Sequence, residues 1–305
     1  MPLDHVTSTD PLDQRDPFGF PPAALIEPLL RVALAEDLPG GIDITSAAMF
    51  DADAITEGVF QSKADGVLAG LAIVDQMFAL LEPRVTVEHL AVDGDRVKPW
   101  QPVARVRGPV RALLAGERTV LNLLMRLSGI ATVTARYVQL VDGTFARIVD
   151  TRKTTPGLRI LEKYAVRVGG GHNHRMSLSD AAMIKDNHLA ASGDPGAAIA
   201  TLRARLPHTA RLEVEVTSLE VARIAARSGA DIILLDNMSV EDMAVVVKEL
   251  HGKAVLEASG GINLETVARV AATGVDVISV GALTHSVKAL DMSFELATVP
   301  AVRAR

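Results

Sequence analysis

Short apolar runs that each end in a polar residue recur through the second half of the chain. They occupy residues 147–150, 181–185, 212–215, 232–236, 254–257 and 277–279. Segments with helical apolar spacing follow the later runs, at 219–227, 240–249 and 264–272. Such alternation predicts parallel strands with right-handed helical crossovers. Polar residues at strand ends are typical of the active-site face of a (β/α) barrel. An open doubly wound sheet is the alternative, although no glycine-rich dinucleotide motif supports it.

The first half of the chain has a different pattern. Residues 1–22 are rich in Asp and Pro and contain no apolar run, so we expect a flexible tail and no signal peptide. A first amphipathic helix follows, and residues 54–110 alternate short apolar runs with Asp-Gly, Gly-Asp and Pro turns, which indicates an α+β module. Residues 112–140 return to a long helical pattern, which we expect to break at Gly129.

The composition narrows the class of protein. With seven Phe, two Tyr and one Trp, the core must be built from aliphatic residues, as in parallel sheets covered by helices. The net charge of −6 argues against a general nucleic-acid binder. No uncharged stretch is long enough to span a bilayer. The absence of cysteine excludes thiolate chemistry and gives no sign of an oxidising compartment, so we expect a cytoplasmic protein.

One region of this acidic chain is strongly basic. Residues 150–189 carry seven Lys or Arg and three His, in the runs D-T-R-K-T-T-P-G-L-R, G-G-G-H-N-H-R and M-I-K-D-N-H. Each run is rich in turn-forming residues. Three such loops can assemble one cationic pocket, and a pocket of this charge suits a small, multiply charged anion.

Each basic candidate has an alternative interpretation. Arg152 and Lys153 form either an anion clamp or a solvated basic turn. His174 and Arg175 follow three glycines, which allow close backbone approach to a ligand but also occur in surface loops. A zinc site from the histidines lacks a third ligand at a suitable spacing. Lys185 is a Schiff-base nucleophile, an electrostatic clamp or a salt-bridged lysine, and its spacing does not decide among these.

Acidic and glycine-rich positions complete the candidate site. Glu215 and Asp236 end consecutive strand patterns and could hold Mg²⁺ or sugar hydroxyls, or pair with the basic residues. Glu213 shares a strand face with Glu215, but Glu215 lies nearer the strand end. Ser259-Gly260-Gly261 and Gly281-Ala282 follow the last two predicted strands, where phosphate groups commonly bind.

These runs together closely resemble the quinolinate phosphoribosyltransferase family. The likeness extends through Ala35-Glu36-Asp37-Leu38, Asp43-Ile44-Thr45, Gly116-Glu117-Arg118 and Leu127-Ser128-Gly129-Ile130-Ala131-Thr132 to the four last strands. It implies an α/β fold with an N-terminal α/β sandwich domain and an incomplete (β/α) barrel. The domains would be 23–128, with 290–305 packing back on it, and 129–289. Thr217 departs from the Asp that is frequent in the family, outside the functional positions.

The resemblance also implies an activity. Quinolinate and phosphoribosyl pyrophosphate, with Mg²⁺, would give nicotinate mononucleotide, pyrophosphate and CO₂ in de novo NAD biosynthesis. The catalytic positions would be Lys153, Lys185, Glu215 and Asp236, the last two also serving Mg²⁺ directly or through water. Substrate binding would involve these four together with Arg118, Arg152, His174, Arg175, Ser259, Gly260, Gly261, Val280, Gly281 and Ala282.

Within that set, Arg118, Arg152, His174 and Arg175 would clamp carboxylates, while Lys153 and Lys185 would face phosphates. Family members are homodimers or hexamers of dimers, in which the residue matching Arg118 comes from the neighbouring subunit. Three other functions are open alternatives: a Schiff-base barrel lyase using Lys185, a non-catalytic anion-binding protein, and a relative acting on another pyridine.

Overall fold

The computed structural model describes residues 19–185, 188 and 191–298. The chain forms two compact units. The first contains residues 1–132, 167–170 and 288–305, and the second contains residues 133–166 and 171–287. Most of the predicted tail at 1–22 lies outside the described residues.

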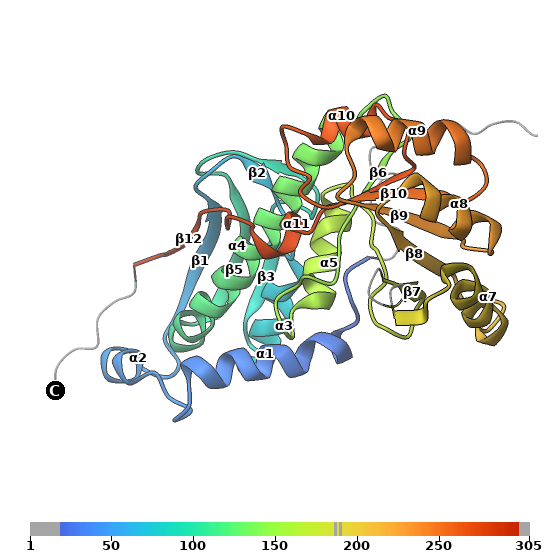
Figure 1. The fold of residues 1–305 in the computed structure, drawn as a ribbon. Coiled ribbons are helices and arrows are strands. Elements are labelled where there is room, and N and C mark those ends of the chain that lie inside the picture. Colours follow the sequence, from blue (N-terminus) through green and yellow to red (C-terminus); the bar gives the residue numbers. More distant parts are fainter. Residues whose placement is uncertain (1–18, 186–187, 189–190, 299–305) are drawn as a thin grey trace, which may run out of the picture. The chain divides into compact units, whose positions relative to one another are not determined.

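The first unit is a four-stranded antiparallel sheet with helices (Figure 1). The strand order is β12-β1-β5-β3, and β2 pairs separately with β4. The elements are α1 (Ala23–Asp37), α2 (Ile44–Met49), β1 (Ile55–Ser62), β2 (Gly66–Val67), α3 (Ala72–Leu81), β3 (Thr86–His89), β4 (Arg96–Val97), β5 (Pro102–Pro109), α4 (Val110–Leu140) and β12 (Met292–Leu296).

Burial along β1 alternates, as expected for a strand with one face on a core. Phe60 is fully buried, and its ring centroid lies 4.5 Å from that of Phe294 on β12. Gly58 leaves room for the same ring, since a Cβ there would lie 2.1 Å from a Phe294 ring atom. The pairing of β12 with β1 therefore depends on aromatic packing across the sheet as well as on backbone hydrogen bonds.

The long helix α4 does not break at Gly129, so that expectation was wrong. Gly129 instead admits the C-terminal part of the chain, because a Cβ there would lie 2.4 Å from the backbone oxygen of Lys288. Ser128 and Thr132, one turn apart, accept hydrogen bonds from the backbone amides of Ala69 and Val67. The run Leu127–Thr132 thus serves as a docking surface for two crossing segments of the first unit.

The second unit is built on a six-stranded parallel sheet. Its elements are β6 (Arg147–Val149), α5 (Arg159–Val168), β7 (Ala182–Ile184), α7 (Pro195–Arg205), β8 (Leu212–Val216), α8 (Leu219–Arg227), β9 (Ile232–Asp236), α9 (Val240–Leu250), β10 (Val255–Ser259), α10 (Val267–Ala271), β11 (Val277–Ser279) and α11 (Ala282–His285). The last residues of α5 belong to the first unit, and the last residues of α4, from 133 to 140, belong to the second.

The strand order β6-β11-β10-β9-β8-β7 decides between the two predicted architectures. From β7 to β11 each strand lies beside its predecessor, and β6 closes the row at the far edge. A doubly wound sheet would reverse direction at a switch point, whereas this order winds one way, as in a barrel opened between β6 and β7. The incomplete barrel is confirmed.

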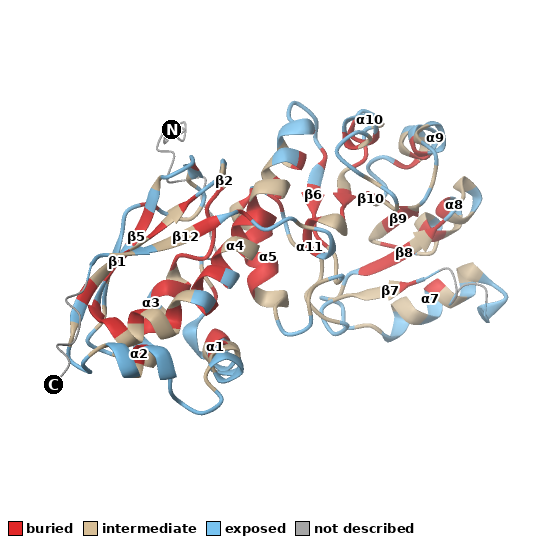
Figure 2. Cartoon of the chain, turned by 90° about the vertical axis from the view of Figure 1, so that its left-hand side faces the viewer, coloured by how far each residue is buried: buried red, intermediate tan, exposed pale blue. Residues whose placement is uncertain are grey.

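Helices cover the outer face of this sheet. α8 packs on β8 and β9, α9 on β10, and α10 on β11 (Figure 1). Ser218 and Ser239 begin α8 and α9 by accepting hydrogen bonds from the amides of Val221 and Asp242. Buried residues concentrate on the strands and on the helix sides that face them (Figure 2). The alternation seen in the sequence therefore buries one continuous core between sheet and helices.

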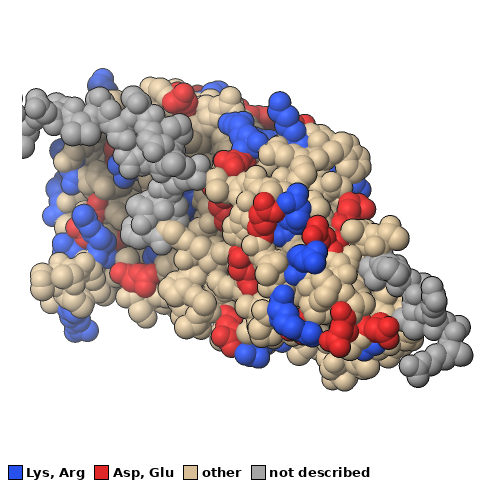
Figure 3. Space-filling model, turned by 180° about the vertical axis from the view of Figure 1, so that it is seen from behind, with Lys and Arg blue, Asp and Glu red and all other residues tan. Residues whose placement is uncertain are grey.

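Two strands end later than the sequence pattern indicated. β8 continues to Val216, and β10 continues to Ser259, so that Glu257 lies inside β10. On the face drawn in Figure 3, Lys and Arg side chains are interspersed with Asp and Glu. Arg223 on α8 donates two hydrogen bonds of 2.6 Å to Glu249 on α9, so these neighbouring helices are joined by an ion pair as well. None of the described helices is long and apolar enough to cross a membrane.

The close approach at Gly129 makes a testable prediction. We expect Gly129→Ala to lower the free energy of unfolding by about 1–3 kcal/mol, because the added methyl group meets backbone rather than a movable side chain. The gain in helix propensity would offset only about 1 kcal/mol. Gly40→Ala, in open space within the same unit, is the control and should change stability little. Equal urea midpoints for the two variants would contradict this account.

Candidate active site

A cavity of about 570 Å³ lies where the strands of the second unit end, a volume typical of small-molecule sites. We call it the strand-end cavity. Among the described residues, those that line it all belong to the second unit. They are Thr151, Arg152, Lys153, His174, Arg175, Met183, Lys185, Glu215, Leu234, Asp236, Asn237, Glu257, Ser259, Gly260, Gly261 and Ser279.

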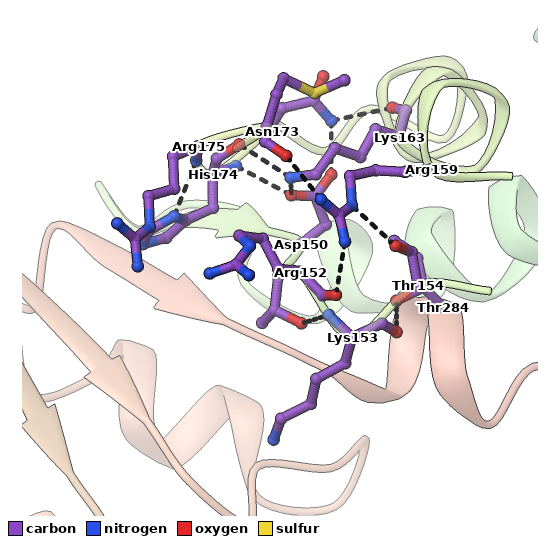
Figure 4. A network of polar contacts seen from close by, with 12 residues as sticks. Asp150, Arg152, Lys153, Thr154, Arg159, Lys163, Asn173, His174, Arg175 and Thr284 are labelled. Atoms are coloured by element: carbon purple, nitrogen blue, oxygen red, sulfur yellow. Dashed lines mark hydrogen bonds and ion pairs between the residues drawn. The ribbon is translucent and has the colours of Figure 1, made fainter. Parts of the chain in front are cut away.

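The loop after β6 places two cations in this cavity. Arg159 on α5 holds the loop by donating to Thr154 Oγ1 at 3.0 Å and to the Met176 carbonyl at 3.0 Å (Figure 4). Thr284 Oγ1 donates to the Lys153 carbonyl at 2.8 Å. The charged ends of Arg152 and Lys153 point away from this network in Figure 4, and Arg152 Nε is buried with no hydrogen-bond partner among the described residues. The backbone is therefore fixed while both charges remain available to a ligand.

A buried ion pair supports the adjacent loop. Asp150 and Lys163 are fully buried and in direct contact. Asp150 also accepts hydrogen bonds from Asn173 Nδ2 at 2.6 Å and from the His174 amide at 2.9 Å, and Lys163 donates to the His174 carbonyl at 2.8 Å. Burial raises the pKa of Asp150 and lowers that of Lys163, while each partner's charge opposes the shift of the other. Removing either partner would leave a buried charge uncompensated, at a cost of about 3–5 kcal/mol.

The three glycines precede this supported segment. Gly170 has φ of 86°, a conformation that other residues rarely adopt. A Cβ at Gly171 would lie 2.8 Å from Thr134 Cγ2 and 2.9 Å from Val166 Cγ1. The chain then runs beside β6, where the His172 amide donates to the Ile148 carbonyl at 2.8 Å. The glycines thus allow a tight turn and close packing that bring His174 and Arg175 to the cavity.

Acidic side chains face these cations in two groups. Glu215 and Asp236, from neighbouring strands β8 and β9, line the strand-end cavity. Glu215 Oε2 lies 3.8 Å from Lys185 Nζ, and Asp236 Oδ2 accepts from Asn237 Nδ2 at 2.9 Å. The basic side chains and these two carboxylates thus bring opposite charges into one cavity, which suits a substrate with both anionic groups and hydroxyls.

The second acidic group surrounds His174. Its Nε2 lies 3.1 Å from Glu213 Oε2 and 3.6 Å from Glu257 Oε1, and both carboxyl groups are buried. Burial lowers the pKa of His174, but the bond to Glu213 and the charge of Glu257 outweigh this effect and raise it overall. Burial, followed by the charge of Glu213, raises the pKa of Glu257 to about 7.

The structure brings most of the predicted residues together. Ten of them line the strand-end cavity: Arg152, Lys153, His174, Arg175, Lys185, Glu215, Asp236, Ser259, Gly260 and Gly261. Val280, Gly281 and Ala282 are not among its lining residues, although Gly281 contacts the stem of Lys153, whose Cδ would lie 3.1 Å from an added Cβ. Arg118 belongs to α4 of the first unit, with 59% of its side chain exposed. Asp186 and Asn187 of the lysine-containing run lie outside the described residues.

Sequence reasoning missed several residues of the site. The sequence pattern places Glu257 at a strand end and predicts no role for it, yet Glu257 lines the cavity. Asn237 adopts φ of 51°, and a Cβ at Gly260 would lie 2.2 Å from its side-chain oxygen, so the two residues fit only with glycine there. The signal for Asn237 was its position directly after a strand-terminal Asp. Lys163 had no signal, because it resembles an ordinary helix surface lysine.

The raised pKa of Glu257 predicts a pH-dependent stability. An unfolded chain releases this proton near pH 4.5, whereas the folded protein keeps it to about pH 7. The protonated carboxyl group of Glu257 therefore contributes its full stabilisation of the folded protein below pH 4.5, and this contribution is lost as the pH rises through about 7. Relative to wild type, Glu257→Gln should gain on the order of 2 kcal/mol between pH 5 and pH 8. Thermal unfolding across this range measures it, with exposed Glu241→Gln as control. Parallel curves for wild type and Glu257→Gln would contradict the assignment.

Comparison with known proteins identifies the family. The family model for the quinolinate phosphoribosyl transferase N-terminal domain matches residues 43–128, and that for the C-terminal domain matches residues 130–295. The chain is 46% identical over 274 residues to the nicotinate-nucleotide pyrophosphorylase [carboxylating] of Mycobacterium leprae, covering 88% of this chain and 95% of that one. It is 44% identical over 271 residues to the probable enzyme of the same name from Bacillus subtilis, covering 89% and 93%.

Solved structures agree with these sequence matches. The nicotinate-nucleotide pyrophosphorylase from Francisella tularensis aligns with a TM-score of 0.87 at 38% identity, over 92% of this chain and 99% of that one. The matches cover both units and include the basic loops, the strand-terminal carboxylates and the long helix described above. The chain belongs to the quinolinate phosphoribosyltransferase family.

Proposed function

We propose that this protein transfers the phosphoribosyl group of phosphoribosyl pyrophosphate to quinolinate and releases CO₂. The products are nicotinate mononucleotide and pyrophosphate, a step of de novo NAD biosynthesis. The observation that carries the proposal is one cavity in which Arg152, Lys153 and Arg175 face Glu215 and Asp236. The relatives named for this activity cover most of the chain.

The charges of the cavity match those of the two substrates. Quinolinate carries two carboxylates, and guanidinium groups bind carboxylates through paired hydrogen bonds, so we assign this substrate to Arg152 and Arg175. Phosphoribosyl pyrophosphate carries several phosphate charges, which suit the compact ammonium groups of Lys153 and Lys185. Ser259, Gly260 and Gly261 line the same cavity, and their backbone amides would contact the sugar phosphate, together with the turn at Val280, Gly281 and Ala282.

Glu215 and Asp236 are suited to Mg²⁺. Among the described residues these two carboxylates belong to no three-ligand cluster, which fits an ion that binds through one or two carboxylates and completes its shell with substrate phosphates and water. When bound, the ion would supply neutralisation of charge on the pyrophosphate leaving group. The same carboxylates can accept hydrogen bonds from ribose hydroxyls.

Catalysis by these residues consists of positioning and electrostatic stabilisation. The pyridine nitrogen bonds to the anomeric carbon as the bond to pyrophosphate breaks. The nitrogen then carries positive charge and stabilises the electron pair left on the ring carbon when the neighbouring carboxylate departs as CO₂. That carbon takes up one proton from solvent, which gives nicotinate mononucleotide. Arg152 and Arg175 would orient the ring for the first step, and Lys153 and Lys185 would stabilise the leaving anion. No covalent enzyme intermediate is required.

A Schiff-base mechanism at Lys185 receives no support from its surroundings. The lysine side chain is 55% exposed and is paired with Glu215, whereas lysines that form Schiff bases are activated by apolar burial or by a neighbouring cation. A non-catalytic anion-binding protein stays an alternative that an activity assay decides.

We also propose that the enzyme acts as a homodimer with shared sites, or as a hexamer of such dimers, in the cytoplasm. Arg118 is half exposed and does not line the strand-end cavity, so it is available to a site on a second copy. α2 of the same unit leaves Ile44 and Met49 largely exposed, which suits a protein contact. The cysteine-free chain is compatible with a reducing compartment.

Direct assay tests the proposed reaction. Purified protein with Mg²⁺, quinolinate and phosphoribosyl pyrophosphate should form nicotinate mononucleotide and CO₂ in equal amounts. Lys185→Ala should lose most of this activity, and borohydride should trap no substrate adduct on the wild-type enzyme. Product from nicotinate but none from quinolinate would move the assignment to another pyridine phosphoribosyltransferase.

Arg152→Ala should remove most quinolinate binding. Losing a charged partner of a carboxylate costs about 2–4 kcal/mol, equivalent to roughly 30- to 1,000-fold in Kd. Titration calorimetry with quinolinate measures the change. Arg269→Ala, which removes an exposed arginine of α10 outside the cavity, is the matched control. Near-normal affinity in Arg152→Ala would count against the assignment of this residue.

Shared sites predict complementation between inactive variants. If Arg118 serves the partner's cavity, a dimer of one Arg118→Ala chain and one Lys185→Ala chain has one intact site. Random reassortment should then restore about one quarter of wild-type activity. The two variants are refolded or co-expressed together and assayed against each variant alone. Activity no greater than the sum of the separate variants would argue for sites completed within one chain.

A further inference from the structure

Two buried carboxyl groups, Glu213 and Glu257, are not used in the proposed chemistry. Glu213 is 1% exposed on β8, and Glu257 is 3% exposed on β10. Buried carboxylates beside an anion-binding cavity oppose the binding of an anion, so we expect them to have another function. Both lie close to Nε2 of His174, so this function concerns the imidazole ring.

The hydrogen bonds of His174 define its tautomer. Nδ1 accepts a hydrogen bond of 2.8 Å from the backbone amide of Arg175, so this nitrogen carries no proton. The ring proton is therefore on Nε2, where Glu213 accepts it and Glu257 Oε1 lies next nearest. Both nitrogens are engaged, which leaves neither for a substrate carboxylate. A second proton could bind only at Nδ1 and would break the bond to Arg175.

The peptide between His174 and Arg175 is held from several directions. The His174 amide donates to Asp150, and the His174 carbonyl accepts from Lys163. The Arg175 guanidinium donates to the Ala181 carbonyl at 2.8 Å and lies 3.5 Å from Met183 Sδ. The bond from the Arg175 amide to the imidazole completes this set. This bond links the orientation of Arg175 to the rotation of the His174 ring.

We propose that Glu213 and Glu257 are positioning residues that act through His174. Glu213 accepts the hydrogen bond from Nε2–H, and Glu257, whose Oε1 lies 3.6 Å away, adds negative charge that favours a proton on this nitrogen. Together they hold the ring in the tautomer whose Nδ1 orients the Arg175 peptide, and the Arg175 side chain is thereby aimed at a carboxylate of the pyridine substrate. This inference rests on the proposed function and gives His174 a role different from the direct carboxylate contact expected from the sequence. The network is an acceptor–imidazole–amide chain, comparable in logic to the outer partners that orient histidine at metal sites.

Isosteric substitutions separate orientation from charge. Glu213→Gln keeps a carbonyl acceptor for Nε2–H, so quinolinate Kd should stay within about 3-fold of wild type, whereas Glu213→Ala should raise it about 10- to 100-fold. His174→Gln loses the acceptor at the Nδ1 position, while Asn can place its oxygen there. His174→Asn should therefore weaken quinolinate binding clearly less than His174→Gln. The KM for phosphoribosyl pyrophosphate should change little in all four variants.

A spectroscopic measurement on the folded wild-type enzyme provides an independent readout. Nitrogen-15 shifts of the His174 ring should report a protonated Nε2 and an unprotonated Nδ1 at pH 7.5. Glu213→Ala should give a mixture of tautomers, and Glu213→Gln should not. The wild-type shifts decide the tautomer even where a variant loses stability.

Equal losses in Glu213→Gln and Glu213→Ala, or a wild-type ring protonated on both nitrogens, would overturn the proposal and make His174 a direct cationic contact. A stoichiometric zinc or manganese ion lost in Glu257→Ala would overturn it too, since the three side chains lie within 4.8 Å of one another and could ligate a metal. Failure of the proposed function is distinguishable, because wild type would then bind no quinolinate and form no nucleotide product.

Discussion

Asp150 and Lys163 meet in the interior of the second unit, where solvent reaches neither side chain. Asp150 follows the edge strand β6, Lys163 lies on α5, and Asn173 and His174 belong to the segment after the three glycines. One buried pair therefore joins a strand end, a helix and a loop. An unpaired charge in this position would lower the stability of the folded protein. The pair therefore fixes how the strand end, the helix and the loop meet, whatever its net contribution to stability. The cationic side of the strand-end cavity is built on this junction.

The charges above this junction are arranged in layers. Asp150 and Glu213 are buried and hydrogen-bonded to Lys163 and His174. The buried Glu257 lies 3.6 Å from His174 and lines the cavity, as Arg152, Lys153 and Lys185 do. A buried charged residue that is paired with a neighbour supports the fold of the site, whereas a cation with unused hydrogen-bond donors can bind a ligand. Arg152 is the clearest case of the second kind, since its buried Nε has no hydrogen-bond partner among the described residues. Glu215 and Asp236 then add the carboxylates that the proposed binding of ribose hydroxyls and Mg²⁺ would use.

The fold was largely predictable from local patterns, and the site only in part. Regular alternation of strands and helices has few compact solutions, so the second unit followed from it. The expected break at Gly129 failed because glycine was read as a helix breaker, whereas the crossing of a distant segment required its missing side chain. Glu257 was overlooked because its role depends on β10 continuing to Ser259. Neither fact is visible in a short window of sequence.

The sequence by itself determined the family, the parallel architecture and most of the charges that line the cavity, with Glu257 as the exception. Those properties depend on residue type and spacing, which the chain carries directly. Only the tertiary structure decided which charges are supporting and which are exposed to a ligand. That distinction depends on burial and on contacts between residues far apart in the chain, such as His174 with Glu213 and Glu257. The positioning role that we propose for His174 rests on such contacts too, because the tautomer of an imidazole is set by the partners of both its nitrogens.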